Sequence, residues 1–317
     1  MKAVTYTKFG TTEVLQLNEV ENPVPQNNEV LIKIHATSVN AYDWRHVRAD
    51  PLLIRLMGGG LFRPKHTILG ADIAGTIISA GKDIQKFKPG DEVFGEVGYG
   101  GFAEYVCSGE NRIVKKPDNI SFEKASAAPM AALTALQGLR DSGNIQPGQN
   151  VLVNGASGGV GSFAVQIAKN FGARVTATCS SEKMEMVLSI GADEVFDYKK
   201  VNITNLDEKF DFIFDIAAFR PANEYKKILK PTGRYAVAGG SIKRIFQVMF
   251  KSMLGNKNIK TVIAKVNTDD LEKISELLRT GEIKPVIDKT FQLSETSSAV
   301  RYVEEGRAKG KVVVVIR

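Results

Sequence analysis

The sequence has few of the residues that build disulfide or metal frameworks. Its 317 residues include two cysteines, one tryptophan and three histidines. Cys107 and Cys179 lie far apart, and the histidines are scattered at 35, 46 and 66. Neither a disulfide framework nor the ligand spacing of a zinc site is visible in this pattern. We therefore expect no bound metal, and a reducing compartment such as the cytoplasm.

Long apolar runs and a strong charge of one sign are also missing. No apolar run approaches the ~20 residues that cross a membrane, and the first residues enter a strand pattern at once, with no signal peptide visible. The net charge is +7, with 43% hydrophobic and 24% charged residues, which is ordinary for a globular protein. Short basic pairs such as Lys115-Lys116 fit solvated faces better than a nucleic-acid footprint. We expect no membrane span and no nucleic-acid partner.

One glycine-rich stretch stands out among the features that are present. A buried strand is predicted at Val151–Val153, and apolar residues recur at helical spacing from Val160 onward. The turn between them is a variant of the dinucleotide-binding fingerprint. A tight turn without a ligand is the alternative, but a further strand at 174–178 favours the fingerprint. The predicted phosphate-binding residues are Ala156, Ser157, Gly158, Gly159 and Val160.

The small residues of this turn have separate mechanical roles. Ala156 turns the chain, Gly158 lets backbone amides approach a pyrophosphate, and Gly161 lets the helix pack closely on the strand. The helix N-terminus would then face the phosphates with unpaired N–H groups and its positive dipole end.

The end of the second strand predicts which nicotinamide cofactor is bound. NAD sites usually place Asp or Glu about 20 residues past the glycines, where it binds the ribose 2′-hydroxyl. Here the chain has Ser180, Ser181 and Lys183, two hydroxyls and an ammonium that suit a 2′-phosphate. Glu182 would oppose this unless it faces solvent, and a solvated role for Lys183 stays open. We predict NADPH.

The organisation of the chain predicts an α/β protein. Residues 1–122 contain many short strands with glycine-rich corners, typical of a compact, partly closed β barrel. Residues 123–266 alternate helices and strands, as in a doubly wound parallel sheet. Residues 267–317 return to mixed patterns, and the terminal run Lys311–Ile316 reads as a strand.

Several motifs together resemble a known family. They are Ser38-Val-Asn40-x-x-Asp43-Trp44, Leu69-Gly-Ala-Asp72-x-x-Gly75, Pro89-Gly-Asp91-x-Val93 and Gly101-Phe-Ala-Glu104-Tyr105. With the glycine turn, they resemble the zinc-independent quinone oxidoreductase branch of the medium-chain dehydrogenase/reductase superfamily. The first two are most similar to the subgroup of the chloroplast-envelope quinone oxidoreductase homologue. The resemblance implies a GroES-like catalytic domain, formed by 1–122 and 267–317, and a Rossmann domain over 123–266.

The same resemblance suggests how the chemistry proceeds without a metal. Zinc-dependent relatives have Cys-His near Val39-Asn40, and Gly-His-Glu where this chain has Gly70-Ala71-Asp72. Hydride donation to an electron-poor alkene or quinone stays feasible without a Lewis acid. For the catalytic groups we expect Asn40 to contact the substrate oxygen or the nicotinamide ribose, although a turn-stabilising role is equally open. Related enzymes often have a tyrosine where this chain has Arg45. We expect Tyr42 to be a substitute proton donor; the alternatives are that Tyr42 is a core residue and that solvent delivers the proton.

Further cofactor contacts are implied by the resemblance and by strand ends. Thr134 would lie near the pyrophosphate or nicotinamide, and Tyr198 near the adenosine 2′-phosphate. The remaining predicted cofactor residues are Asp215, Ala238, Gly239, Gly240 and Lys311, the last reaching toward phosphates.

We therefore expect an NADPH-dependent reductase of quinones or α,β-unsaturated carbonyls. An enoyl-thioester reductase is the first alternative, and a non-catalytic NADPH-binding interaction protein is the second. The resemblance also implies a homodimer, formed through the Rossmann domain by a sheet edge near 259–264.

Overall fold

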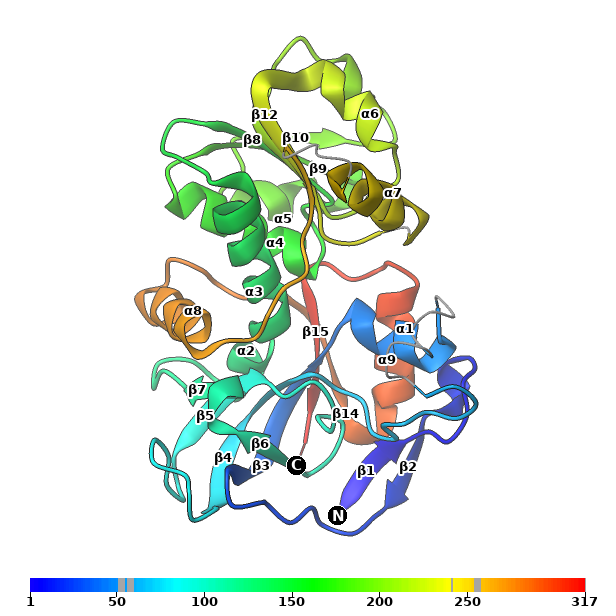
Figure 1. The fold of residues 1–317 in the computed structure, drawn as a ribbon, viewed down its shortest axis with the longest axis vertical. Coiled ribbons are helices and arrows are strands. Elements are labelled where there is room, and N and C mark those ends of the chain that lie inside the picture. The colour runs from blue at the N-terminus through cyan, green and yellow to red at the C-terminus, as the bar shows by residue number, and fades with distance from the viewer. Residues whose placement is uncertain (51–54, 56–59, 241, 254–257, 317) are drawn as a thin grey trace. The chain divides into compact units, whose positions relative to one another are not determined.

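The chain folds into two units, one of them built from two separate stretches of sequence. Unit 1 comprises 1–130 and 266–317, and unit 2 comprises 131–265. The structure is a computed structural model that describes residues 1–50, 55, 60–240, 242–253 and 258–316 (Figure 1).

Unit 1 contains a sheet of parallel and antiparallel strands. The last strand in the sequence is an internal strand of this sheet, with a neighbour on each side. The strand order is β14-β15-β3-β4-β5-β7, with β6 also paired to β3. Its strands are β3 (Glu29–Val39), β4 (Asp72–Ala80), β5 (Glu92–Glu96), β6 (Tyr105–Gly109), β7 (Ile113–Lys115), β14 (Ile287–Gln292) and β15 (Lys311–Val315). All five residues of β15 are buried, which explains its unbroken valine run. A separate hairpin pairs β1 (Lys2–Thr5) with β2 (Gln16–Glu19).

Four α-helices lie in the described part of unit 1. They are α1 (Ala41–Arg48), α2 (Phe122–Ser126), α8 (Thr268–Thr280) and α9 (Thr296–Glu304). Sequence patterns did not predict α1, which begins two residues after β3 ends. Its start is fixed by a hydrogen bond from the backbone N–H of Asn40 to Asp43 Oδ2, at 2.7 Å. This contact holds Asn40 and Tyr42 at the first turn of a helix rather than in a loop.

Unit 2 contains a six-stranded sheet whose described strand pairs are all parallel. The strand order is β10-β9-β8-β11-β12-β13. The strands are β8 (Asn150–Asn154), β9 (Arg174–Cys179), β10 (Glu194–Asp197), β11 (Phe210–Asp215), β12 (Leu229–Val237) and β13 (Ile259–Thr261). The helices are α3 (Pro129–Gln137), which begins in unit 1, and α4 (Gly159–Asn170), α5 (Met184–Ser189), α6 (Ala222–Tyr225) and α7 (Ile242–Met253).

The strand order reverses between β8 and β11. From β8 the chain moves outward through β9 to β10, then returns to β11 and moves the other way. Because right-handed crossovers are the rule, α4 and α5 cover one face of the sheet while α6 and α7 cover the other (Figure 1). Ligands of such sheets bind at the carboxyl ends of the strands flanking this reversal. The predicted fold class, a GroES-like domain with a doubly wound parallel sheet, is confirmed.

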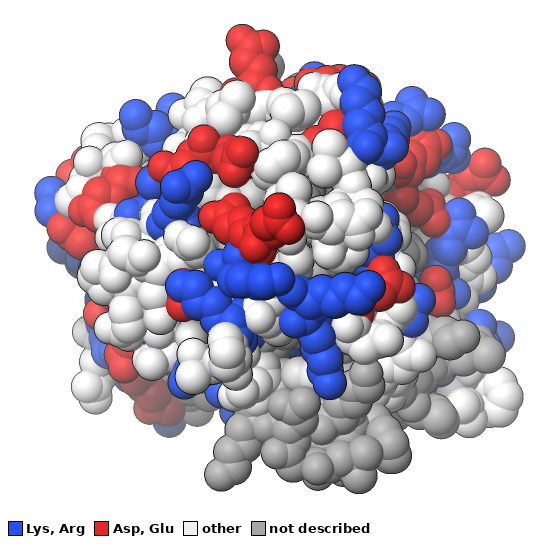
Figure 2. Space-filling view, turned by 90° about the horizontal axis from the view of Figure 1, so that it is seen from above, with Lys and Arg blue, Asp and Glu red and all other residues white. Residues whose placement is uncertain are grey.

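Surface charge is mixed rather than segregated. Figure 2 shows basic and acidic side chains interspersed over one face, with a short row of basic side chains near its centre. In unit 2, Lys230 pairs with Asp211, and Lys169 with Asp193. Among the residues that the structure describes, no helix is both long and apolar enough to cross a membrane.

Candidate cofactor loop and buried polar cluster

The β8–α4 loop has two glycines with opposite packing environments. A Cβ on Gly161 would lie 2.2 Å from the Gly155 carbonyl oxygen, so close packing of helix on strand requires glycine there. A Cβ on Gly158 would meet only that same oxygen, at 3.8 Å. Gly158 has an ordinary φ of −86° and is the residue before α4. The protein's own packing therefore does not require glycine at 158, whereas the close approach of a ligand would.

A buried polar network lies next to this loop at the strand ends. Asp215 accepts hydrogen bonds from Asn154 Nδ2 at 2.6 Å, the Tyr235 hydroxyl at 2.6 Å and the Ala218 amide at 2.8 Å. Burial raises the pKa of the Asp215 carboxyl, and these donors act against that rise. Its oxygens are used to fix β8, β11 and β12, so the predicted cofactor contact of Asp215 stays a prediction.

Sequence reasoning missed Asn154 and Tyr235 in this network. The Asn154 amide also contacts the Tyr225 hydroxyl at 2.9 Å and accepts from Thr178. The available signal was a polar residue at the carboxyl end of three buried strands, which a parallel sheet brings to one edge.

The predicted 2′-phosphate residues lie together at the ends of β9 and β10. Ser180 Oγ donates to Glu182 Oε1 at 3.2 Å, and Ser181 Oγ donates to Asp197. Lys183 is only 8% exposed, whereas Tyr198 is 46% exposed. The hydrogen bond from Ser181 is the main cause that holds the pKa of Asp197 below its usual range. Glu182 is exposed to solvent, yet it accepts from Ser180, so a phosphate would bind these hydroxyls only by displacing their carboxylate partners.

The glycines predicted at the end of β12 follow a backbone requirement. A Cβ on Gly240 would lie 2.0 Å from the Ala217 carbonyl oxygen, and one on Gly239 would lie 2.7 Å from that of Ile216. The 238–240 segment therefore runs tightly beside the residues that follow β11. Thr134 is buried on α3. The cofactor roles of Thr134, Ala238, Gly239 and Gly240 stay predictions.

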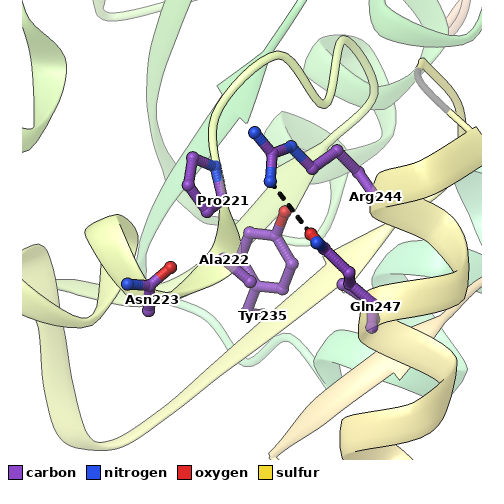
Figure 3. A pocket seen from close by; sticks show the side chains of 7 residues that line it. Pro221, Ala222, Asn223, Tyr235, Arg244 and Gln247 are labelled. Carbon is purple, nitrogen blue, oxygen red and sulfur yellow. Dashed lines mark hydrogen bonds between the residues drawn. The ribbon is translucent and has the colours of Figure 1, made fainter.

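Unit 2 also contains a pocket between α6, β12 and α7. Its volume is about 360 Å³. Figure 3 shows Arg244 donating to Gln247, at 2.9 Å, above the Tyr235 ring. The Tyr235 hydroxyl already donates to Asp215. A ligand in this pocket would therefore meet the charged Arg244 side chain and a tyrosine whose hydroxyl is already hydrogen-bonded. The lining residues are Pro221, Ala222, Asn223, Tyr235, Arg244, Gln247 and Val248.

In unit 1, the predicted residues Asn40 and Lys311 meet in a buried cluster around Asp72. Lys311, 2% exposed, donates to Asn40 Oδ1 and lies 3.3 Å from Asp72 Oδ2. Asn40 Nδ2 donates to the same carboxylate oxygen at 2.9 Å, as does Ser38 Oγ. Because both ends of the Asn40 amide have partners, a substrate contact would require it to exchange one of them. The Lys311 ammonium is likewise held by this cluster, so its reach toward phosphates remains a prediction.

Asp43 sits beside this cluster and is fully buried. Its carboxylate accepts hydrogen bonds from the backbone N–H of Asn40 and, at 3.1 Å, from the backbone N–H of Gly70. Burial raises the pKa of Asp43 to about 7, although both amides oppose the rise. Among the described residues, no group of three or more His, Cys, Asp or Glu is placed to hold a metal ion.

Comparisons with known proteins agree with this architecture. A family model for the "Alcohol dehydrogenase GroES-like domain" matches residues 26–118, and one for "Zinc-binding dehydrogenase" matches 190–314. A chloroplastic quinone-oxidoreductase, QR1, of Triphysaria versicolor is 35% identical over 99% of this chain and 98% of its own. The chloroplastic NADPH-dependent alkenal/one oxidoreductase of Arabidopsis thaliana is 33% identical over 99% and 79%.

Solved structures show the same fold. The quinone oxidoreductase from Coxiella burnetii superposes with a TM-score of 0.89 at 28% identity, covering 100% of this chain and 99% of its own. Together, the β8–α4 loop, the parallel sheet and the GroES-like domain define a two-domain dinucleotide-binding oxidoreductase of the medium-chain dehydrogenase/reductase superfamily. Within that superfamily, the chain belongs to the quinone oxidoreductase branch, whose members include alkenal/one reductases.

Proposed function

We propose that this protein is an NADPH-dependent reductase of quinones or α,β-unsaturated carbonyls. The observation that carries the proposal is the open space beside the Gly158 backbone at the start of α4. No packing contact of the protein itself requires a glycine at this position. The names of the relatives, a quinone-oxidoreductase and an alkenal/one oxidoreductase, supply the acceptor class.

The residues of unit 2 fit the cofactor. The amides at 158–160, at the N-terminus of the 12-residue helix α4, would bind the pyrophosphate. Ser180, Ser181 and Lys183 would bind the 2′-phosphate, with the hydroxyls exchanging their carboxylate partners. When bound, NADPH supplies a hydride. What remains for this chain is to orient the acceptor and to deliver a proton.

In unit 1, Tyr42 is the proposed proton donor. It lies in the first turn of α1, and burial together with a hydrogen bond to Tyr99 raises its pKa, so the hydroxyl stays protonated at neutral pH. Lys311 and Asp72 would fix the Asn40 amide next to it. We also propose a cytoplasmic location, consistent with two free cysteines.

The test is NADPH oxidation by purified, metal-free protein. The acceptors are an ortho-quinone, a long-chain alkenone, a short alkenal, an enoyl-thioester and a simple ketone, with NADH run in parallel. We expect turnover of the quinone or the enones with NADPH. Preference for the thioester would instead identify an enoyl-thioester reductase, and tight NADPH binding without turnover would identify an interaction protein.

A further inference from the structure

Two tyrosines and a histidine of unit 1 form a connected chain of side chains. Tyr42 and His46 lie one turn apart on α1, and Tyr99 follows β5. His46 Nδ1 lies 2.8 Å from the Tyr42 carbonyl oxygen, and its Nε2 lies 3.4 Å from the Tyr99 hydroxyl. The Tyr42 and Tyr99 rings lie 5.7 Å apart between centroids, and a hydrogen bond with the Tyr99 side chain is, after burial, a cause of the raised pKa of Tyr42. We call these three residues the Tyr42–Tyr99–His46 chain.

These contacts fix the direction in which the hydrogen bonds of the Tyr42–Tyr99–His46 chain run. A carbonyl oxygen only accepts, so Nδ1 of the neutral imidazole must carry the proton. Nε2 then accepts from the Tyr99 hydroxyl, whose oxygen is free to accept from Tyr42. Each hydroxyl proton therefore points toward His46 while the imidazole is neutral. Protonation of His46 places a proton on Nε2 and reverses the direction, so that Tyr42 can donate outward.

The surroundings of the chain are mostly aromatic. The His66 ring stacks on Tyr99 with 3.8 Å between centroids, and the Tyr42 and His46 rings are 3.9 Å apart. The charged or titratable groups that act on the three residues are Tyr6, Asp43, His66 and Glu96. Burial is the main cause that lowers the pKa of His46; nearby His66 adds to the decrease, and the bond to the Tyr42 carbonyl opposes it.

We propose that the Tyr42–Tyr99–His46 chain is a proton relay that supplies the reduction with its proton. This rests on the proposed function. Bound NADPH would supply a hydride to the β-carbon of an enone, and the product of that addition would be an enolate. The Tyr42 O–H bond then breaks as a C–H bond forms at the α-carbon. Tyr42 regains a proton from Tyr99, Tyr99 from Nε2 of the His46 imidazolium, and His46 from water.

The balance of the step is complete with these groups. The alkene is reduced by two electrons, NADPH is oxidised to NADP⁺, and one proton is taken from water. His46 and Tyr99 contact Tyr42 rather than the substrate, so they act as relay residues and Tyr42 alone as the acid. Because the imidazolium form drives the relay, turnover should rise as the pH falls toward the lowered pKa of His46, below 6.5.

The experiment compares Tyr99→Phe and His46→Gln with the wild type. Tyr99→Phe keeps the ring that stacks on His66 and removes only the hydroxyl. We expect kcat with an alkenone to fall about 10-fold or more, the rise toward acid pH to disappear, and the solvent deuterium isotope effect to increase, with the Kd for NADPH unchanged. His35→Gln is the matched control, because His35 Nε2 contacts Thr76 on β4 and lies outside the chain.

A second measurement does not depend on turnover. In the wild type, ¹⁵N NMR of the side chains should show His46 with its neutral proton on Nδ1, and Tyr99→Phe should change the pKa of His46 but not that of His35. A His46 with its proton on Nε2, or a pH–rate profile that Tyr99→Phe leaves unchanged, would overturn the relay. A wild type that reduces no acceptor would overturn the proposed function and the relay's role in it, while the NMR result would still report whether the chain exists.

Discussion

Lys311 illustrates how single residues far apart in sequence create a site that local patterns do not reveal. Its ammonium reaches Asn40, 271 positions away, and Asp72, 239 positions away. A buried ammonium is tolerable because a carboxylate and an amide oxygen replace its water. The sequence shows a lysine at the start of a valine run, and nothing in that run indicates its partners.

At the same scale, cofactor preference tests Lys183. Lys183→Ala should raise the Kd for NADPH about 10- to 100-fold, because it would remove the charge-assisted hydrogen bond that we propose between Lys183 and the 2′-phosphate. The Kd for NADH should change little. Lys209→Ala is the control, because it removes the same charge just before the amino end of β11, whereas Lys183 follows the carboxyl end of β9. Fluorescence titration with NADPH and with NADH measures the two Kd values. An equal loss of affinity for both cofactors would contradict the assignment of Lys183 to the 2′-phosphate.

Glu96 supplies a prediction about pH and stability. Burial, followed by repulsion from Asp72, raises the pKa of Glu96 from 4.5 to about 7. A raised pKa in the folded state means that the protonated carboxyl stabilises the fold below pH 4.5 and that this stabilisation is lost as the pH rises through 7. Relative to Glu96→Gln, the wild type should lose on the order of 2 kcal/mol of unfolding free energy between these pH values. Urea unfolding across that range measures it; parallel curves for the two proteins would refute the shift.

At the scale of elements, the β8–α4 loop was the most predictable part of the molecule. The strand, the glycine turn and the helix lie within 21 consecutive residues, so the local sequence contains nearly all the information. Helix α1 was not predictable in the same way, because Asp43 both caps the helix and binds the Gly70 amide from a distant segment. The alternation of helices and strands predicted a doubly wound parallel sheet in unit 2. The pairing of β15 with β3 was not predictable in this way, because it joins residues about 275 positions apart.

The two glycines of this loop should separate folding from binding. Gly161→Ala should lower stability by about 1–3 kcal/mol because its Cβ has no room against Gly155 and Ala156. Gly158→Ala should leave thermal stability nearly unchanged yet weaken NADPH binding at least 10-fold, because its Cβ has room within the protein but would enter the space that we propose for the pyrophosphate. Thermal unfolding and cofactor titration of both variants test this. Unchanged NADPH affinity in Gly158→Ala would remove the main support for the loop's function.

At the scale of the whole molecule, the edge of the parallel sheet predicts assembly. The edge strand β13 pairs with β12, and Ile263 beyond it is 69% exposed. We expect a homodimer through 259–264, so light scattering at micromolar concentration should give twice the mass of one 34.6 kDa chain. Ile263→Glu should shift the mass toward the monomer, whereas Val24→Glu, at an 84% exposed site in unit 1, should not. A monomeric wild type would refute the prediction.

The position of β15 has a consequence for the order in which the chain is made. Unit 2 is one continuous stretch, so it can fold once residue 265 has left the ribosome. Unit 1 must wait, because β3 lacks one neighbour until 311–315 are synthesised. The sheet of unit 1 is therefore completed last, and until then residues 36–39 of β3 have no partner on the side that β15 later covers, whereas residues 29–33 can already pair with β6.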